Sequence, residues 1–70
     1  MDKALMRSVM AKNNDNQEKL AEALILPVSG VNARINGKID FRASEISKIV
    51  KRYSLSPQET TDIFFTESAS

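Results

Sequence analysis

The sequence has no cysteine and no histidine, and these two absences exclude more than any other feature of its composition. Without cysteine the chain has neither a disulfide bond nor a thiolate ligand for zinc. Without histidine it has no Cys–His zinc finger and no imidazole for acid–base catalysis. No apolar run approaches the roughly 20 residues that cross a bilayer, and the first twelve residues lack the apolar core of a signal peptide. We therefore expect a soluble cytoplasmic protein that uses no metal or other cofactor and does not contact a membrane.

The remaining composition is that of a small globular protein. A chain of 70 residues forms one domain at most, so residues 1–70 are expected to be a single unit with a modest core. Its net charge is only +1, but residues 1–52 carry all ten Lys and Arg against six acidic residues, whereas residues 53–70 carry three acidic residues and no basic one. A basic body with an acidic end fits a polyanionic partner, although an ordinary solvated surface accounts for the charge equally well.

The clearest pattern lies in residues 16–38, NQEKLAEALILPVSGVNARINGK. Apolar residues recur there at helical spacing, at Leu20 and Leu24 and again at Val31 and Ile35. The spacing predicts one helix over residues 17–24 and a second over residues 27–36, joined by a short corner. Either Asp15 or Asn16 can cap the first of these helices, and Asn-Gly after Ile35 is a typical helix stop.

QEKLAE, followed at fixed spacing by INGK, resembles the DNA-binding helix-turn-helix of the phage Cro/repressor family (XRE-like regulators). The similarity continues more weakly to about Phe65. It implies an all-α fold, a compact bundle of five short helices of the lambda-repressor-like type, with the second and third helices forming the helix-turn-helix. The family usually has Ser or Thr at the position of Asn16, so the resemblance favours Asn16 over Asp15 as the cap of the second helix. The sequence departs from the family at Ile25, where Gly is usual. Because a β-branched residue avoids positive φ, we expect either a second helix one residue longer or a turn of different shape, with Pro27 as the first residue of the third helix.

Two further helices are predicted on either side of this pair. The first is capped by Asp2 and runs to Lys12, with Leu5 and Val9, and as further candidates Met6 and Met10, on its apolar stripe. Another covers residues 43–52, and its expected buried stripe consists of Ile46, Ile49, Val50 and Tyr53. The connection before it is expected to place Ile39 and Phe41 in the core.

The last helix is predicted over residues 56–65, because Ser-Pro-Gln-Glu at its start combines a capping serine, a proline in the first turn and a capping-box glutamate. Residues 66–70 are expected to be frayed. Adjacent Phe64 and Phe65 cannot both face one small core, so these two are the candidates for a dimer interface. Packing of Phe64 against the first helix is the alternative.

The resemblance implies that the third helix enters the major groove of DNA and that its outward residues contact bases. Those residues are Val28, Ser29, Asn32 and Ala33. Asn32 has the groups to pair with adenine, and Val28 and Ala33 suit thymine methyl groups. Because no Arg or Lys stands among them, we expect an operator whose contacted positions are rich in A and T. For each residue a solvated helix surface is the alternative.

The expected phosphate contacts are Asn16, Gln17, Lys19, Arg34, Lys38 and Arg42. Gln17 opens the second helix, where the family uses this residue against a phosphate, and the helix N-terminus also attracts anions. For Lys19 and Arg42, an unengaged surface charge is an equally good interpretation.

By this resemblance the chain is a transcriptional regulator, of a phage or prophage, that binds double-stranded operator DNA as a homodimer. The alternative is an antirepressor or antitoxin-like module that keeps this fold and captures another regulator. We do not expect an enzyme, because no carboxylates or hydroxyls stand at a catalytic spacing.

Overall fold

The computed structural model describes residues 1–65, so the fraying expected for residues 66–70 lies outside the described residues. The helices are α1 (Lys3–Lys12), α2 (Gln17–Leu24), α3 (Val28–Ile35), α4 (Ala43–Tyr53) and α5 (Pro57–Phe64). No strand occurs among residues 1–65, which confirms the all-α class. Each helix also lies within one or two residues of its predicted position.

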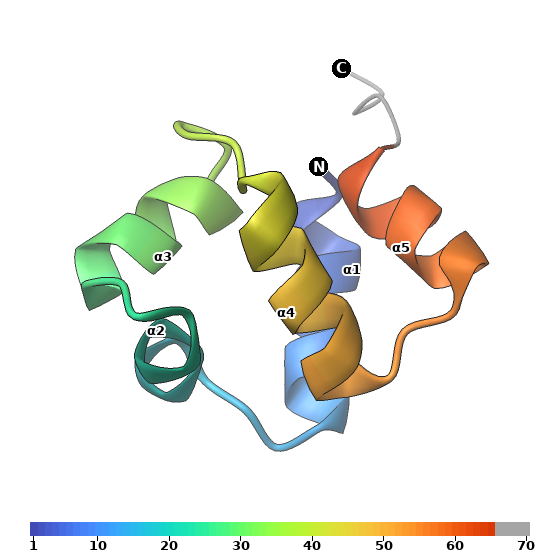
Figure 1. Ribbon diagram of the computed structural model, residues 1–70, viewed down its shortest axis with the longest axis horizontal. Helices are drawn as coiled ribbons and strands as arrows, with labels where there is room; N and C mark the ends of the chain where they lie inside the picture. The colour runs from blue at the N-terminus through green and yellow to red at the C-terminus, as the bar shows by residue number, and fades with distance from the viewer. Residues whose placement is uncertain (66–70) are drawn as a thin grey trace.

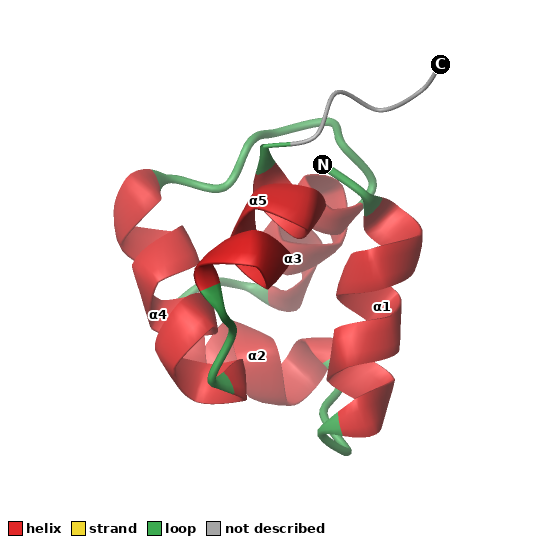
Figure 2. Ribbon diagram, turned by 90° about the vertical axis from the view of Figure 1, so that its right-hand side faces the viewer, coloured by secondary structure: helices red, strands yellow, loops and turns green. Residues whose placement is uncertain are grey.

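The helices are arranged around α1 and α4, which lie in the middle of the molecule (Figure 1). On one side lie α2 and α3, which pack most closely on each other, and on the other side lies α5 (Figure 1). Figure 2 looks at the molecule from the α5 side and places α3 behind it. The backbone N–H of Asp2 donates to the carbonyl of Ile63 at 2.7 Å, which ties the start of α1 to the end of α5.

All five helices contribute to one hydrophobic core. Its most deeply buried side chains are Met6, Leu20, Val31, Ile35, Ile49 and Ile63. The periodicity of α2 and α3 predicted their buried residues correctly. In α1, Met6 and Met10 are buried, whereas Leu5 is 41% exposed, so its placement on the buried stripe was wrong. Neighbouring stripes of a helix are offset by only 100°, and periodicity alone does not choose between them.

Two further core predictions need correction. Ile39 is 48% exposed, and only Phe41 anchors the connection between α3 and α4, through an edge-to-face contact with Phe64 at 5.8 Å between ring centroids. In α4, Ile49 and Tyr53 are buried as expected, but Ile46 and Val50 are only half-buried. The inward face of α4 includes Glu45 instead, which is 7% exposed because it pairs with a residue of α3.

The predicted caps of α1, α2 and α5 are confirmed by their side-chain hydrogen bonds. Asp2 Oδ1 accepts from the N–H of Leu5 at 3.0 Å, and Asn16 Oδ1 accepts from that of Lys19 at 2.8 Å. At α5, Ser56 Oγ accepts from the N–H of Glu59 at 3.1 Å, and Glu59 Oε1 accepts from that of Ser56 at 2.9 Å. Each capped N–H would otherwise lack an intrahelical partner.

Helices α1 to α4 all end in the same way, with a residue of positive φ after the last turn. These residues are Asn14, Ile25, Gly37 and Ser54, with φ between 52° and 79°. At each end the N–H of the following residue bonds back across the last turn, in the pattern of a Schellman motif, as from Lys38 to the carbonyl of Ala33 at 2.9 Å. Gly and Asn suit this conformation, whereas Ser and especially Ile do not.

The turn between α2 and α3 therefore differs from both expectations for it. Helix α2 ends at Leu24, and Ile25 adopts φ 57° and ψ 49°, the left-handed conformation for which Gly is the usual residue. Ile25 bears the strain of this conformation, with its side chain 84% exposed. Pro27 is the cap of α3 and not its first residue, because its ψ of 152° is extended.

Candidate nucleic-acid interface

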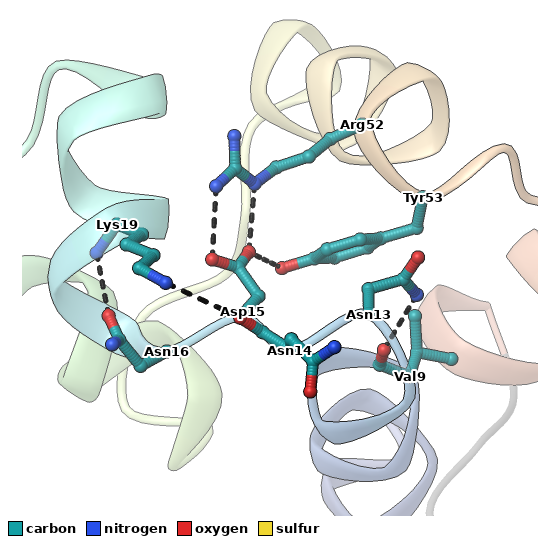
Figure 3. Close-up of polar contacts among 8 residues, drawn as sticks. All are labelled: Val9, Asn13, Asn14, Asp15, Asn16, Lys19, Arg52 and Tyr53. Atoms are coloured by element: carbon teal, nitrogen blue, oxygen red, sulfur yellow. Dashed lines mark hydrogen bonds and ion pairs between the residues drawn. The ribbon is translucent and has the colours of Figure 1, made fainter.

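The start of α2 is held in place by the side chain of Asp15 in the loop before it (Figure 3). Two nitrogens of Arg52, Nε and Nη2, donate to the Asp15 carboxylate at 2.8 Å and 3.0 Å, and the hydroxyl of Tyr53 donates to the same carboxylate. The Asp15 side chain is only 4% exposed. These contacts of Asp15 with Arg52 and Tyr53 form a clasp, which fixes the loop before α2 to the end of α4.

This cluster is anionic at its centre at neutral pH. The hydrogen bond from Arg52 lowers the pKa of Asp15 to about 2, against its ordinary value of 3.8, even though burial opposes the shift. Burial, with the hydrogen bond to Asp15 adding to it, raises the pKa of the Tyr53 hydroxyl well above its ordinary value. Tyr53 therefore remains a donor, and the loop stays clasped over the whole physiological range.

The N-terminus of α2 lies directly after this clasp, with Asn16 as its cap and Gln17 as its first residue. Asn16 is exposed and uses its oxygen to cap the N–H of Lys19 (Figure 3), so its amide NH₂ takes no part in the cap. The N–H groups of a first helical turn have no partner within the helix, so this end of α2 offers donors to an anion. Lys19 is exposed, and its Nζ lies 3.5 Å from the carbonyl of Asn14.

The orientation of α3 is fixed by a second clasp, between Arg34 and Glu45 of α4. Arg34 Nε lies 3.0 Å from Glu45 Oε1, and the two side chains are 10% and 9% exposed. The second guanidinium nitrogen donates to the carbonyl of Gly30 at 3.0 Å, and a Cβ at Gly30 would lie 3.2 Å from it. Gly30 therefore leaves room for the arginine to fold back along its own helix.

The outward face of α3 is neutral. Val28 is 44% exposed, Ser29 and Asn32 are exposed, and Ala33 is half-buried. Asn32 points towards α2, where its Nδ2 donates to Gln17 Oε1 at 3.2 Å. The four predicted base-contact residues thus lie on one helix face, and Gln17 joins that face to the start of α2.

The six predicted phosphate contacts do not share one environment. Asn16, Lys19, Lys38 and Arg42 are exposed, and Gln17 is half-buried beside Asn32. Arg34 is engaged with Glu45 and has little exposed surface, so its role in the described structure is to hold α3 against α4.

Two side chains outside the predicted base and phosphate contacts adjoin this surface, Asn36 and Lys3. Asn36 Nδ2 donates to Asn32 Oδ1 at 3.0 Å, and Lys3 Nζ donates to Asn36 Oδ1 at 3.1 Å. Asn36 could have been found from its position four residues after Asn32, on the same helix face. Lys3 is 33 residues away in sequence and gave no local signal.

The two candidate dimerisation residues differ in their surroundings. Phe64 is half-buried against Phe41, whereas Phe65 is 65% exposed. Phe65 lies at a surface groove of about 600 Å³ whose apolar lining also includes Met1 and Ile39. Phe65 therefore remains available to a partner, and Phe64 serves the monomer.

Comparisons of the chain with models of known protein families, with curated proteins and with solved structures gave no match. Among residues 1–65, no helix has the length and apolar character that crossing a bilayer requires.

Proposed function

We propose that this chain is a sequence-specific regulator of transcription that binds double-stranded DNA through α2 and α3, in the manner of the Cro/repressor helix-turn-helix family. One observation carries the proposal: α3 presents Val28, Ser29 and Asn32 outward while Gln17 at the start of α2 bonds to that same face. A helix with small and amide side chains outward suits a major groove, and a helix N-terminus beside it suits the adjoining phosphate.

The distribution of charged side chains supports the proposal. The outward face of α3 carries no cation, whereas exposed Lys19, Lys38 and Arg42 stand before and after the helix. Phosphate contacts supply most of the affinity, and base edges supply the sequence preference. Asn32 then selects adenine and Val28 a thymine methyl group, which gives an operator rich in A and T.

A homodimer is part of the proposal, because one such module makes few contacts. Two copies on half-sites about one helical turn apart double the contacts. The exposed Phe65 and the groove beside it are the surface that we assign to this contact.

The test is selection of binding sites from random DNA by the purified full-length chain, followed by titration of the selected site at several salt concentrations. With three cationic phosphate contacts per copy, a dimer should lose about a thousandfold in affinity between roughly 50 and 200 mM salt. We expect conserved A·T positions in each half-site. Selection of conserved guanines at the central positions, or no enrichment at all, would contradict the proposal.

A second candidate function is capture of another regulator, by an antirepressor or antitoxin-like module of the same fold. The neutral face of α3 and the exposed apolar side chains of Ile39 and Phe65 favour it. The same titration separates the two candidates, because a protein-capturing module would show neither site enrichment nor steep salt dependence on DNA.

A further inference from the structure

A chain of side-chain hydrogen bonds crosses the surface that we assign to DNA, and it joins three helices. It runs from Lys3 in α1 to Asn36 after α3, then to Asn32 in α3 and to Gln17 in α2, over distances of 3.1 Å, 3.0 Å and 3.2 Å. Three of its members are primary amides, each with a donor end and an acceptor end. Such a row is ordered only if every amide points the same way.

Lys3 is the member that can set this direction. An ammonium group only donates, whereas an amide can present either its oxygen or its nitrogen. Lys3 therefore requires the oxygen of Asn36, which turns the nitrogen of Asn36 towards Asn32. Asn32 must then receive that bond on its oxygen and direct its own nitrogen to Gln17. Hydrogen bonds in series also strengthen one another, which favours the aligned row.

The far end of the row is where the direction matters. Gln17 accepts from Asn32 on its Oε1, so its NH₂ group is the donor end of the row, at the first residue of α2. A phosphate oxygen needs a donor at this place, and the reversed row would present the carbonyl oxygen of Gln17 instead. The same ordering fixes which end of Asn32 lies nearer α2, and hence how its remaining donor and acceptor face a base.

We infer that Lys3 is a positioning residue, which orients the amides of Asn36, Asn32 and Gln17 so that Gln17 offers a donor to DNA phosphate and Asn32 a fixed donor–acceptor order to a base. The inference rests on the proposed function for its DNA part, but the direction of the row is a property of the protein alone. Two experiments address these parts separately.

The direction of the row is tested in the absence of DNA, by NMR of the side-chain amide groups. Lys3→Met should shift the amide signals of Gln17, although Lys3 and Gln17 do not touch, and Lys3→Arg should restore them. Lys3→Glu places an acceptor at the end of the row, so it should reverse the direction and slow exchange of the Gln17 amide protons with water. Lys12→Met is the matched control, since it removes an exposed lysine from the same helix. If Lys3→Met leaves the side-chain amide signals of Gln17 unshifted, the inference is overturned.

The consequence for DNA is tested with the selected operator. Lys3→Met should weaken binding by about 2- to 10-fold for each copy of the dimer, the range of one net hydrogen bond. Most of this loss should disappear when Gln17→Ala is already present, because both changes remove the same phosphate contact. A lysine that merely contacts a phosphate would instead give additive losses and lower the salt slope of the dimer by about two, one for each copy. Additive losses overturn the inference while the proposed function stands, whereas an unmodified chain that binds no selected site overturns the function itself.

Discussion

Replacing Ile25 with glycine should make the protein more stable, although it removes a large apolar side chain. Ile25 is held at φ 57° after the last turn of α2. An L-residue in this conformation costs about 1–2 kcal/mol, and glycine avoids that cost. Glycine in turn lowers the stability by about 0.5–1 kcal/mol, because it gives the unfolded chain more conformational freedom to lose on folding. Because the side chain is 84% exposed, little buried apolar surface is lost with it.

The net gain is about 0.5–1 kcal/mol, which for a domain of this size raises the melting temperature by about 2–8 °C. The assay is thermal unfolding followed by circular dichroism, supported by urea titration. Ile39→Gly is the matched control, because Ile39 is also an exposed isoleucine in a connection, 48% exposed, but does not have positive φ. It should lower the stability. If Ile25→Gly destabilises the protein as much as the control does, the strain argument fails.

Three other perturbations have definite expected outcomes. Because the pKa of Asp15 falls from 3.8 to about 2 on folding, its contribution of at most about 2 kcal/mol is complete above pH 3.8 and is lost as the pH falls through about 2. Urea titrations at pH 5 and pH 2.5 should show this decline, and less of it in Asp15→Asn. Glu45→Gln should lower the free energy of unfolding by about 3 kcal/mol, because it leaves the guanidinium of Arg34 buried without a counter-ion. The double change with Arg34→Met should cost less than the two single changes together. Phe65→Ser should weaken self-association about tenfold in sedimentation without lowering the melting temperature, whereas Phe64→Ser should lower that temperature.

The helices were predictable because the signals that start and stop them are local. Asn16 and Ser56 cap α2 and α5 as predicted, and Gly37 follows the end of α3, where the Asn-Gly pair predicted a helix stop. The stripes of α2 and α3 followed from spacing alone. These features need only residues three or four apart along the chain.

What escaped prediction depends on residues distant in sequence. The engagement of Arg34 needs Glu45, and a sequence pattern cannot distinguish an arginine that faces DNA from one folded against the next helix. Ile25 adopts a conformation that its own preference opposes, because packing of α3 on α2 decides the turn. In the candidate site, the outward residues of α3 were predictable as one helix face, but the hydrogen bonds from Asn32 to Gln17 and from Lys3 to Asn36 were not.

The clasp on Asp15 has a consequence for the order of events during folding. Its two partners are 37 and 38 residues further along the chain, so it closes only after α4 has come to rest beside the first loop. A newly synthesised or partly unfolded chain in which α2 and α3 are already helical still lacks the clasp that fixes the start of α2 to α4. The proposed DNA binding should therefore appear in a single step with completion of the whole fold, and a truncated chain that ends before α4 should not show it.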